Sequence, residues 1–196
     1  MKSIYALILT TFSAFVVMSQ AENQRYEFNF GFERVAANEK LPDKWFQFGS
    51  GYYLKIDTAE KKSGNNSILI EQPAVIAENS FGSVASTIPA NYQGKEIELR
   101  GFLKLKNVSD GFAGLWLRID GDSGVLQFDN MQSRQISGST DWTQHSIKLS
   151  LPEDGSKITF GALLTGKGQL WVDDLQLLID GKDVSEAKRR PAIENK

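Results

Sequence analysis

The chain contains no cysteine and a single histidine, His145, among its 196 residues. Without cysteine it has no disulfide framework, no thiolate nucleophile and no residue for lipoprotein-type acylation, and the familiar zinc sites rich in Cys or His are excluded. A Ser-His-Asp triad needs only one histidine, but the chain lacks the Gly-x-Ser-x-Gly turn that presents the serine in many hydrolases. We therefore predict that the protein is not an enzyme.

The chain also has no large excess of charge of one sign: it contains 22 Lys and Arg and 24 Asp and Glu, which gives a net charge of −2. Such a balance predicts neither a nucleic-acid partner nor an anionic membrane surface. The one long apolar run, residues 4–18, follows Lys2 and precedes Ser19-Gln20-Ala21. This pattern predicts a signal peptide over residues 1–21 and a periplasmic or secreted mature chain without membrane insertion. An uncleaved anchor is the alternative.

Helical periodicity is missing as well, since no segment carries a 3.6-residue apolar stripe. Apolar and polar residues alternate instead, which is typical of half-buried antiparallel strands. About ten such strands imply an all-β, two-sheet sandwich or a barrel. We expect one β-sandwich domain over residues 22–179 and a flexible tail over 180–196. The expected strands are 26–32, 44–56, 66–71, 81–88, 97–106, 112–119, 124–129, 143–151, 157–164 and 168–178.

The last of these strands contains a carboxylate in an apolar setting. Strict alternation places Asp173 on the same face as Trp171, Leu175 and Leu177. A buried carboxylate without partners costs several kcal/mol. Asp173 is therefore expected to contact a cation, to accept several backbone N–H groups, or to be protonated.

Three motifs occur in a recognisable order: Asn29-Phe30-Gly31-Phe32-Glu33, then Lys62-Ser63-Gly64-Asn65-Asn66-Ser67-Ile68, and finally Trp171-Val172-Asp173-Asp174-Leu175. Together they resemble the galactose-binding-like jelly rolls, especially bacterial carbohydrate-binding modules. Lys62 stands where those turns usually have histidine. The middle of the chain, residues 114–121 with 128–131 and 140–142, resembles β-sandwich domains found alone or beside hydrolases of the erythromycin-esterase and peptidase types. The resemblance implies a jelly-roll β-sandwich that acts as a non-catalytic binding module.

The resemblance also implies a structural calcium ion at one edge of the sandwich. Its ligands would be Glu33 and Asp173, with Asp174 and backbone oxygens of residues 61–65 as further candidates; oxygen donors of this kind suit calcium. In the alternative, Asp173 accepts hydrogen bonds from the turn without any metal.

A candidate ligand site lies on the strand over residues 112–119. Alternation puts Leu115, Leu117 and Ile119 in the core and Trp116, Arg118 and Asp120 on the opposite face. An indole ring stacks on the apolar side of a sugar, and charged groups bind its hydroxyls. We expect a carbohydrate or a related polar ligand to bind Trp116, Arg118, Asp120, Gln127, Asn130 and Arg134.

Two alternatives stay open for this site. Trp116 would belong to a second core if the loop over residues 128–137 covers it. A different function is also open, because no catalytic domain is attached: the sandwich would then be a structural or interaction domain that docks on another exported protein.

Overall fold

The computed structural model describes residues 28–37, 39–75, 77–78 and 80–190. The predicted signal peptide and the last six residues of the predicted tail lie outside the described residues. Among the residues it does describe, no helix has the length and apolar character needed to cross a membrane.

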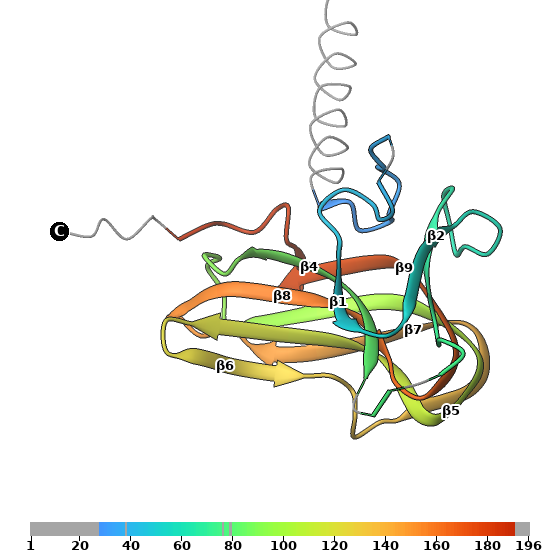
Figure 1. Cartoon of the computed structure of the whole chain (residues 1–196). Coiled ribbons are helices and arrows are strands. Elements are labelled where there is room, and N and C mark those ends of the chain that lie inside the picture. Colours follow the sequence, from blue (N-terminus) through green and yellow to red (C-terminus); the bar gives the residue numbers. More distant parts are fainter. Residues whose placement is uncertain (1–27, 38, 76, 79, 191–196) are drawn as a thin grey trace, which may run out of the picture.

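The described chain folds into antiparallel strands arranged in two layers (Figure 1). The first layer has the order β1-β4-β8-β5-β6, and the second has β2-β3-β9-β5-β7, with the short β10 on β9. The predicted all-β two-sheet sandwich is confirmed. The strands are β1 (Phe46–Ser50), β2 (Tyr53–Asp57), β3 (Ser67–Glu71), β4 (Phe81–Pro89), β5 (Glu96–Gly121), β6 (Gly124–Asp129), β7 (Ile136–Ser150), β8 (Gly155–Leu164), β9 (Lys167–Ile179) and β10 (Lys182–Asp183).

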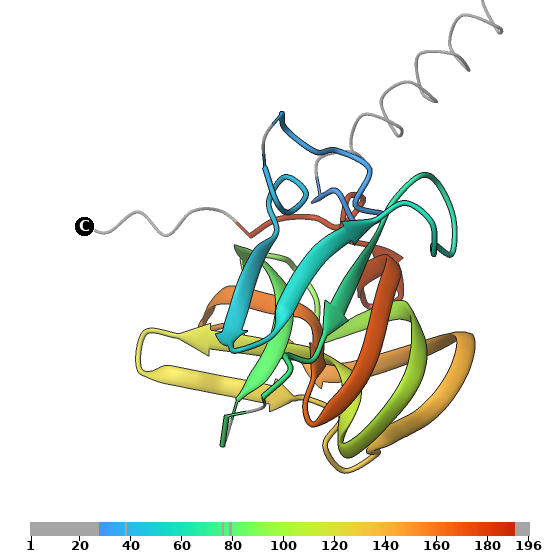
Figure 2. The same cartoon turned by 45° about the vertical axis from the view of Figure 1, so that its right-hand side comes forward.

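Strand β5 belongs to both layers and curves from one to the other (Figures 1 and 2). Its first half pairs with β7 and β9, and its second half pairs with β6 and β8. The sequence predicted two strands here, over 97–106 and 112–119. The chain bends without ending because Asn107 and Asp110 adopt positive φ angles of 56° and 55°, a conformation that Asn and Asp tolerate better than most residues.

The core fills the space between the layers. Alternate residues of the first layer, such as Leu117 and Phe160, meet Ile68, Leu99 and Val172 of the second, and all five are fully buried. The predicted orientation of Leu115, Leu117 and Ile119 toward this core is confirmed. Apolar and polar residues therefore alternate along the strands because one face of each layer is removed from water.

The phase predicted for β9 is wrong beyond Asp173. Leu170 and Val172 face the core, and so do Leu175 and Leu177. The switch of parity occurs at a bulge, where Phe102 pairs with Asp173 but Arg100 pairs with Gln176. Asp174 in the bulge has a φ of 48°. Trp171 and Asp173 consequently point away from the core, toward the loop that joins β2 to β3.

Both ends of the domain also differ from expectation. The described part of the predicted strand 26–32 forms a turn, in which the Phe32 N–H donates to Asn29 O. The predicted strand 44–56 is divided into β1 and β2 at Gly51, whose φ is 86°. The start of the predicted flexible tail is packed instead: β10 pairs with β9, and Val184 is buried in the core.

Candidate functional site

A groove of about 360 Å³ lies on the outer face of the first layer, opposite the core. The strand order brings its lining together. Phe48 comes from β1, Phe81 from β4 and Leu163 from β8, while Trp116 and Arg118 come from β5. On the far side the lining continues along β6 and the loop that follows it, through Phe128, Asn130 and Gln132.

Trp116 forms the floor of this groove and not an open platform. Only 4% of the residue is exposed, and its indole Nε1 donates a hydrogen bond of 2.8 Å to Ser83 Oγ. The ring packs beside Phe48, with 5.4 Å between ring centroids, and shares a small apolar cluster with Phe112 and Leu163. Trp116 therefore belongs to a second core, as in the alternative stated above. The side chain that packs on its ring is Phe48 of β1, which the alternative did not include.

The exposed aromatic faces of the groove belong to two residues that the sequence reasoning missed. Phe48 is 44% exposed and Phe128 is 53% exposed, and both line the groove. The segment Phe46-Gln47-Phe48 could have indicated an aromatic surface, because alternation places two phenylalanines on one face of an expected strand. Exposed aromatic rings on either side of a groove can stack on a ligand in a way that buried Trp116 cannot.

Arg118 and Asp120 form a close ion pair on the same face. Arg118 Nη2 lies 2.5 Å from Asp120 Oδ1, and Nε lies 2.7 Å from the same oxygen. Asp120 is 7% exposed, and Lys157 Nζ is 3.7 Å from its Oδ2. Arg118 lines the groove whereas Asp120 does not, so the carboxylate acts by holding the guanidinium in place.

The structure brings Asn130 to the groove but directs Gln127 and Arg134 elsewhere. A bulge after Ile119 shifts the pairing of β5 with β6, so that Gln127 lies opposite core-facing Ile119 while Phe128 lies opposite Arg118. Arg134 Nη2 lies 2.5 Å from Asp129 Oδ2, and its Nη1 donates to Ser146 O at 2.8 Å. Neither Gln127 nor Arg134 lines the groove.

Asp173 lies in a second polar site, on the outer face of the other layer. Its Oδ2 accepts backbone hydrogen bonds from Lys62 at 2.8 Å and Ser63 at 3.1 Å, and its Oδ1 accepts the Asp174 N–H at 2.7 Å. Asp173 is fully buried, and this desolvation raises its pKa to about 6, although the three N–H contacts act in the opposite direction. Acceptance of several backbone N–H groups, one of the predicted alternatives, is thus observed.

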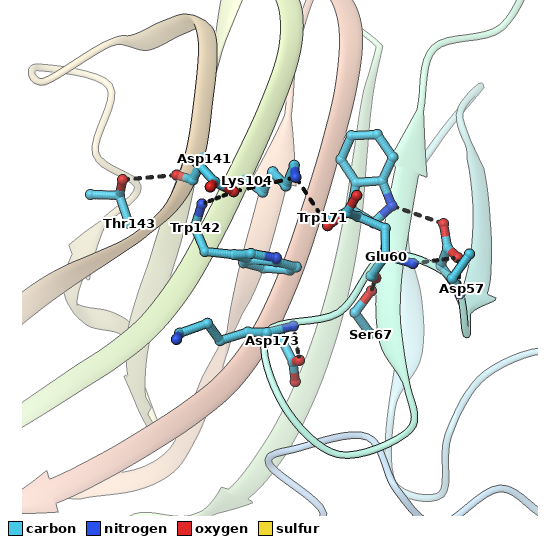
Figure 3. A network of polar contacts seen from close by, with 11 residues as sticks. Asp57, Glu60, Ser67, Lys104, Asp141, Trp142, Thr143, Trp171 and Asp173 are labelled. Carbon is cyan, nitrogen blue, oxygen red and sulfur yellow. Dashed lines mark hydrogen bonds and ion pairs between the residues drawn. The ribbon is translucent and has the colours of Figure 1, made fainter.

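The loop over Asp173 is held by further polar contacts (Figure 3). Trp171 Nε1 donates to Asp57 Oδ2 at 2.9 Å, next to the start of the loop. Lys104 Nζ lies between two carboxylates, 3.0 Å from Glu60 Oε1 and 3.3 Å from Asp141 Oδ1. These contacts fix the loop across the strands β5 and β9.

Glu33 and Asp174 bind the same loop. Glu33 accepts the Asn65 N–H at 2.9 Å, and Asp174 Oδ1 accepts the Ser63 hydroxyl at 2.9 Å. The donors facing these carboxylates are N–H and O–H groups, whose positive ends do not suit the approach of a cation. Among the described residues, no group of three or more His, Cys, Asp or Glu side chains is placed to hold a metal ion. Calcium binding by Glu33, Asp173 and Asp174 stays a prediction.

Comparison with solved structures identifies the fold. The chain superposes on the xylan-binding CBM22-1 domain of Paenibacillus barcinonensis Xyn10C with a TM-score of 0.52 and 15% identity, over 76% of this chain and 91% of that one. TmCBM61, solved in complex with β-1,4-galactotriose, gives a TM-score of 0.51 and 11% identity over 77% and 95%. The protein therefore has the jelly-roll β-sandwich fold of these carbohydrate-binding modules.

Sequence comparison gives a different kind of relative. Over 140 residues the chain is 38% identical to an uncharacterized HTH-type transcriptional regulator, YbfP, of Bacillus subtilis (strain 168). The match covers 69% of this chain and 47% of the regulator, so the chain spans about half the length of that relative. No protein-family model matches the chain.

Proposed function

We propose that this chain, which has the fold of carbohydrate-binding modules, is an exported, non-catalytic module that binds a glycan in the groove of its first layer. One observation carries the proposal: Phe48 and Phe128 present exposed rings to the same groove, from strands that lie on opposite sides of buried Trp116. Sugar rings have apolar faces that stack on aromatic side chains, while their hydroxyls need polar partners.

The groove supplies those polar partners at fixed positions. Arg118 is held by Asp120, and Asn130 and Gln132 lie beside it. A binding site that combines an apolar floor with a few placed polar groups is typical of small-molecule and saccharide recognition. The fold neighbours named above, one a xylan-binding domain and one solved with a galactotriose, support the same class of ligand.

The test is a glycan panel that includes xylan and β-1,4-galactan oligosaccharides, probed with the mature protein and two variants. Phe128→Ala should weaken binding by about tenfold, which corresponds to roughly 1.4 kcal/mol for a lost stacking contact. Tyr53→Ala is the matched control, because Tyr53 is an exposed aromatic, at 65%, that does not line the groove. It should bind like the wild type.

Two results would overturn the proposal. Absence of binding across the panel, together with recovery of one exported protein by the immobilised mature chain, would favour the alternative of an interaction domain. Equal loss of affinity in Phe128→Ala and Tyr53→Ala would place the glycan outside the groove. Export itself is tested separately, by fractionating cells and determining the N-terminal residue of the mature chain.

A further inference from the structure

The groove has two chemically unlike halves. The half built by β1, β4 and β8 presents only apolar side chains, namely Phe48, Phe81 and Leu163. The half built by the second part of β5, by β6 and by the following loop also has aromatic rings, from Phe112, Trp116 and Phe128. It differs because it adds the polar side chains of Arg118, Asn130 and Gln132. A ligand that lies across the groove therefore meets two different environments.

The polar atoms that border the apolar half are engaged within the protein. Trp116 Nε1 donates to Ser83 Oγ. Thr165 Oγ1 accepts the Phe112 N–H at 2.9 Å and lies 3.2 Å from Phe112 O, to which it donates. A ligand hydroxyl placed here would lose its water partners without gaining a hydrogen bond, which costs free energy.

The polar half, in contrast, has N–H donors that are not used within the described part of the protein. Arg118 uses Nε and Nη2 on Asp120, and within the described part of the chain its Nη1 makes no hydrogen bond. Asn130 uses its Oδ1 to accept the Gln132 N–H at 3.1 Å, and its Nδ2 donates to none of the described residues, so it can donate to a ligand. This half is suited to oxygen acceptors such as carbonyl groups.

We infer that the glycan recognised by this groove carries O-acetyl groups; the inference rests on the proposed function and specifies its ligand. An acetyl ester combines a methyl group, which suits the half formed by Phe48, Phe81 and Leu163, with a carbonyl oxygen that accepts hydrogen bonds from the donors of Arg118 and Asn130. An unsubstituted hydroxyl at the same position can accept hydrogen bonds from the same donors, but it leaves the apolar half without a partner. The acetyl group thus distinguishes the decorated polysaccharide from the plain one.

The experiment compares each polysaccharide with its own de-esterified form. O-acetylated xylan and O-acetylated glucomannan are titrated calorimetrically against the mature protein, before and after mild alkaline treatment that removes the esters. Burial of one methyl group predicts about a fourfold preference for the acetylated form, and more where several acetyl groups bind.

Variants locate the preference in the groove. Phe48→Ser should abolish the preference, because it places a polar group in the apolar half. Phe46→Ser is the matched control: Phe46 lies on the same strand, is 41% exposed against 44% for Phe48, and does not line the groove. It should retain the preference. Melting curves of both variants confirm that each is folded.

The outcomes separate this inference from the proposal on which it rests. Equal affinity for both forms, or tighter binding of the de-esterified form, would overturn the acetyl inference while glycan binding in the groove stands. A preference that survives in Phe48→Ser would also overturn it, because the acetyl group would then bind elsewhere. Failure of every form to bind, in the titrations and on the panel, would remove the proposed function itself.

Discussion

Asp173 Oδ2 lies 2.8 Å from the backbone nitrogen of Lys62, so a carboxylate on β9 holds the loop that joins β2 to β3. The contact is partly buried, and the two residues are 111 positions apart in the chain. Glu33 and Asp174 also accept hydrogen bonds from this loop. Asp173 is thus the centre of a cluster of carboxylates that accept hydrogen bonds from backbone N–H and hydroxyl groups. The ionisation of Asp173 should therefore affect the stability of the domain.

We expect the contribution of Asp173 to stability to fall as the pH rises from about 4 to above 6. The folded-state pKa of Asp173, about 6, exceeds the ordinary value of 3.8, so the folded protein binds an extra proton between these values. The contribution is fully present below pH 4 and is lost through pH 6, a change of about 2 to 3 kcal/mol. Chemical denaturation across this range measures it.

Asp173→Asn isolates this effect from other titrating groups. Asp57 and Glu98, for example, have lowered pKa values, because Asp57 accepts hydrogen bonds from Trp171, Ala59 and Glu60 and Glu98 pairs with Arg100, so they make stability rise with pH. The unfolding free energy of the wild type relative to that of Asp173→Asn should fall as the pH rises from 4 to 7. Parallel profiles for the two proteins would show that Asp173 has an ordinary pKa in the fold.

The predicted calcium ion is tested on the same samples. An ion bound by Glu33, Asp173 and Asp174 would raise the melting temperature by roughly 5 to 11 °C at a hundredfold excess over Kd. It would also keep Asp173 ionised and remove the pH dependence described above. Coincident melting curves with and without chelator, in protein shown to be metal-free by elemental analysis, would reject the calcium site.

Trp116→Ala and Phe128→Ala should separate stability from binding. Trp116 is 4% exposed and its indole satisfies Ser83, so its truncation should cost about 3 to 5 kcal/mol of unfolding free energy. Phe128 is 53% exposed, so its truncation should change stability by less than about 1 kcal/mol while it weakens glycan binding. Denaturant titrations of both variants give the values. An unchanged stability in Trp116→Ala, with binding lost, would return Trp116 to the role of a ligand platform.

The sequence predicted faces correctly wherever a strand runs without interruption. Leu115, Leu117 and Ile119 alternate with Trp116 and Arg118 as expected, because no bulge falls between them. The predicted faces fail at two of the bulges. At Asp174 a positive φ reverses the parity of β9, and after Ile119 a shift of one residue moves Gln127 to the core side and Phe128 to the groove. At the first bulge the sequence offers only the tolerance of Asp for positive φ, and at the second it offers no marker.

The groove could not be assembled from the sequence for a related reason. Phe48 and Phe128 are 80 positions apart, and their common location depends on the strand order β1-β4-β8-β5-β6. Alternation within a strand says which residues share a face, but it does not say which strands are neighbours. Trp116 was therefore identified while the aromatic rings that surround it were missed.

Variants of Arg118 and Asp120 should distinguish an effect on stability from an effect on glycan binding. Arg118→Met should lower the unfolding free energy by about 1 to 3 kcal/mol, because among the described residues it leaves the buried Asp120 carboxylate with only the Lys157 ammonium, at 3.7 Å. The double variant Arg118→Met/Asp120→Asn removes that stranded charge and should recover most of the stability. Glycan affinity should stay low in both, since the guanidinium donors are absent from each. Denaturation and calorimetric titration of the two variants measure the pair of effects. Recovery of affinity together with stability in the double variant would show that Arg118 supports the fold and does not contact the ligand.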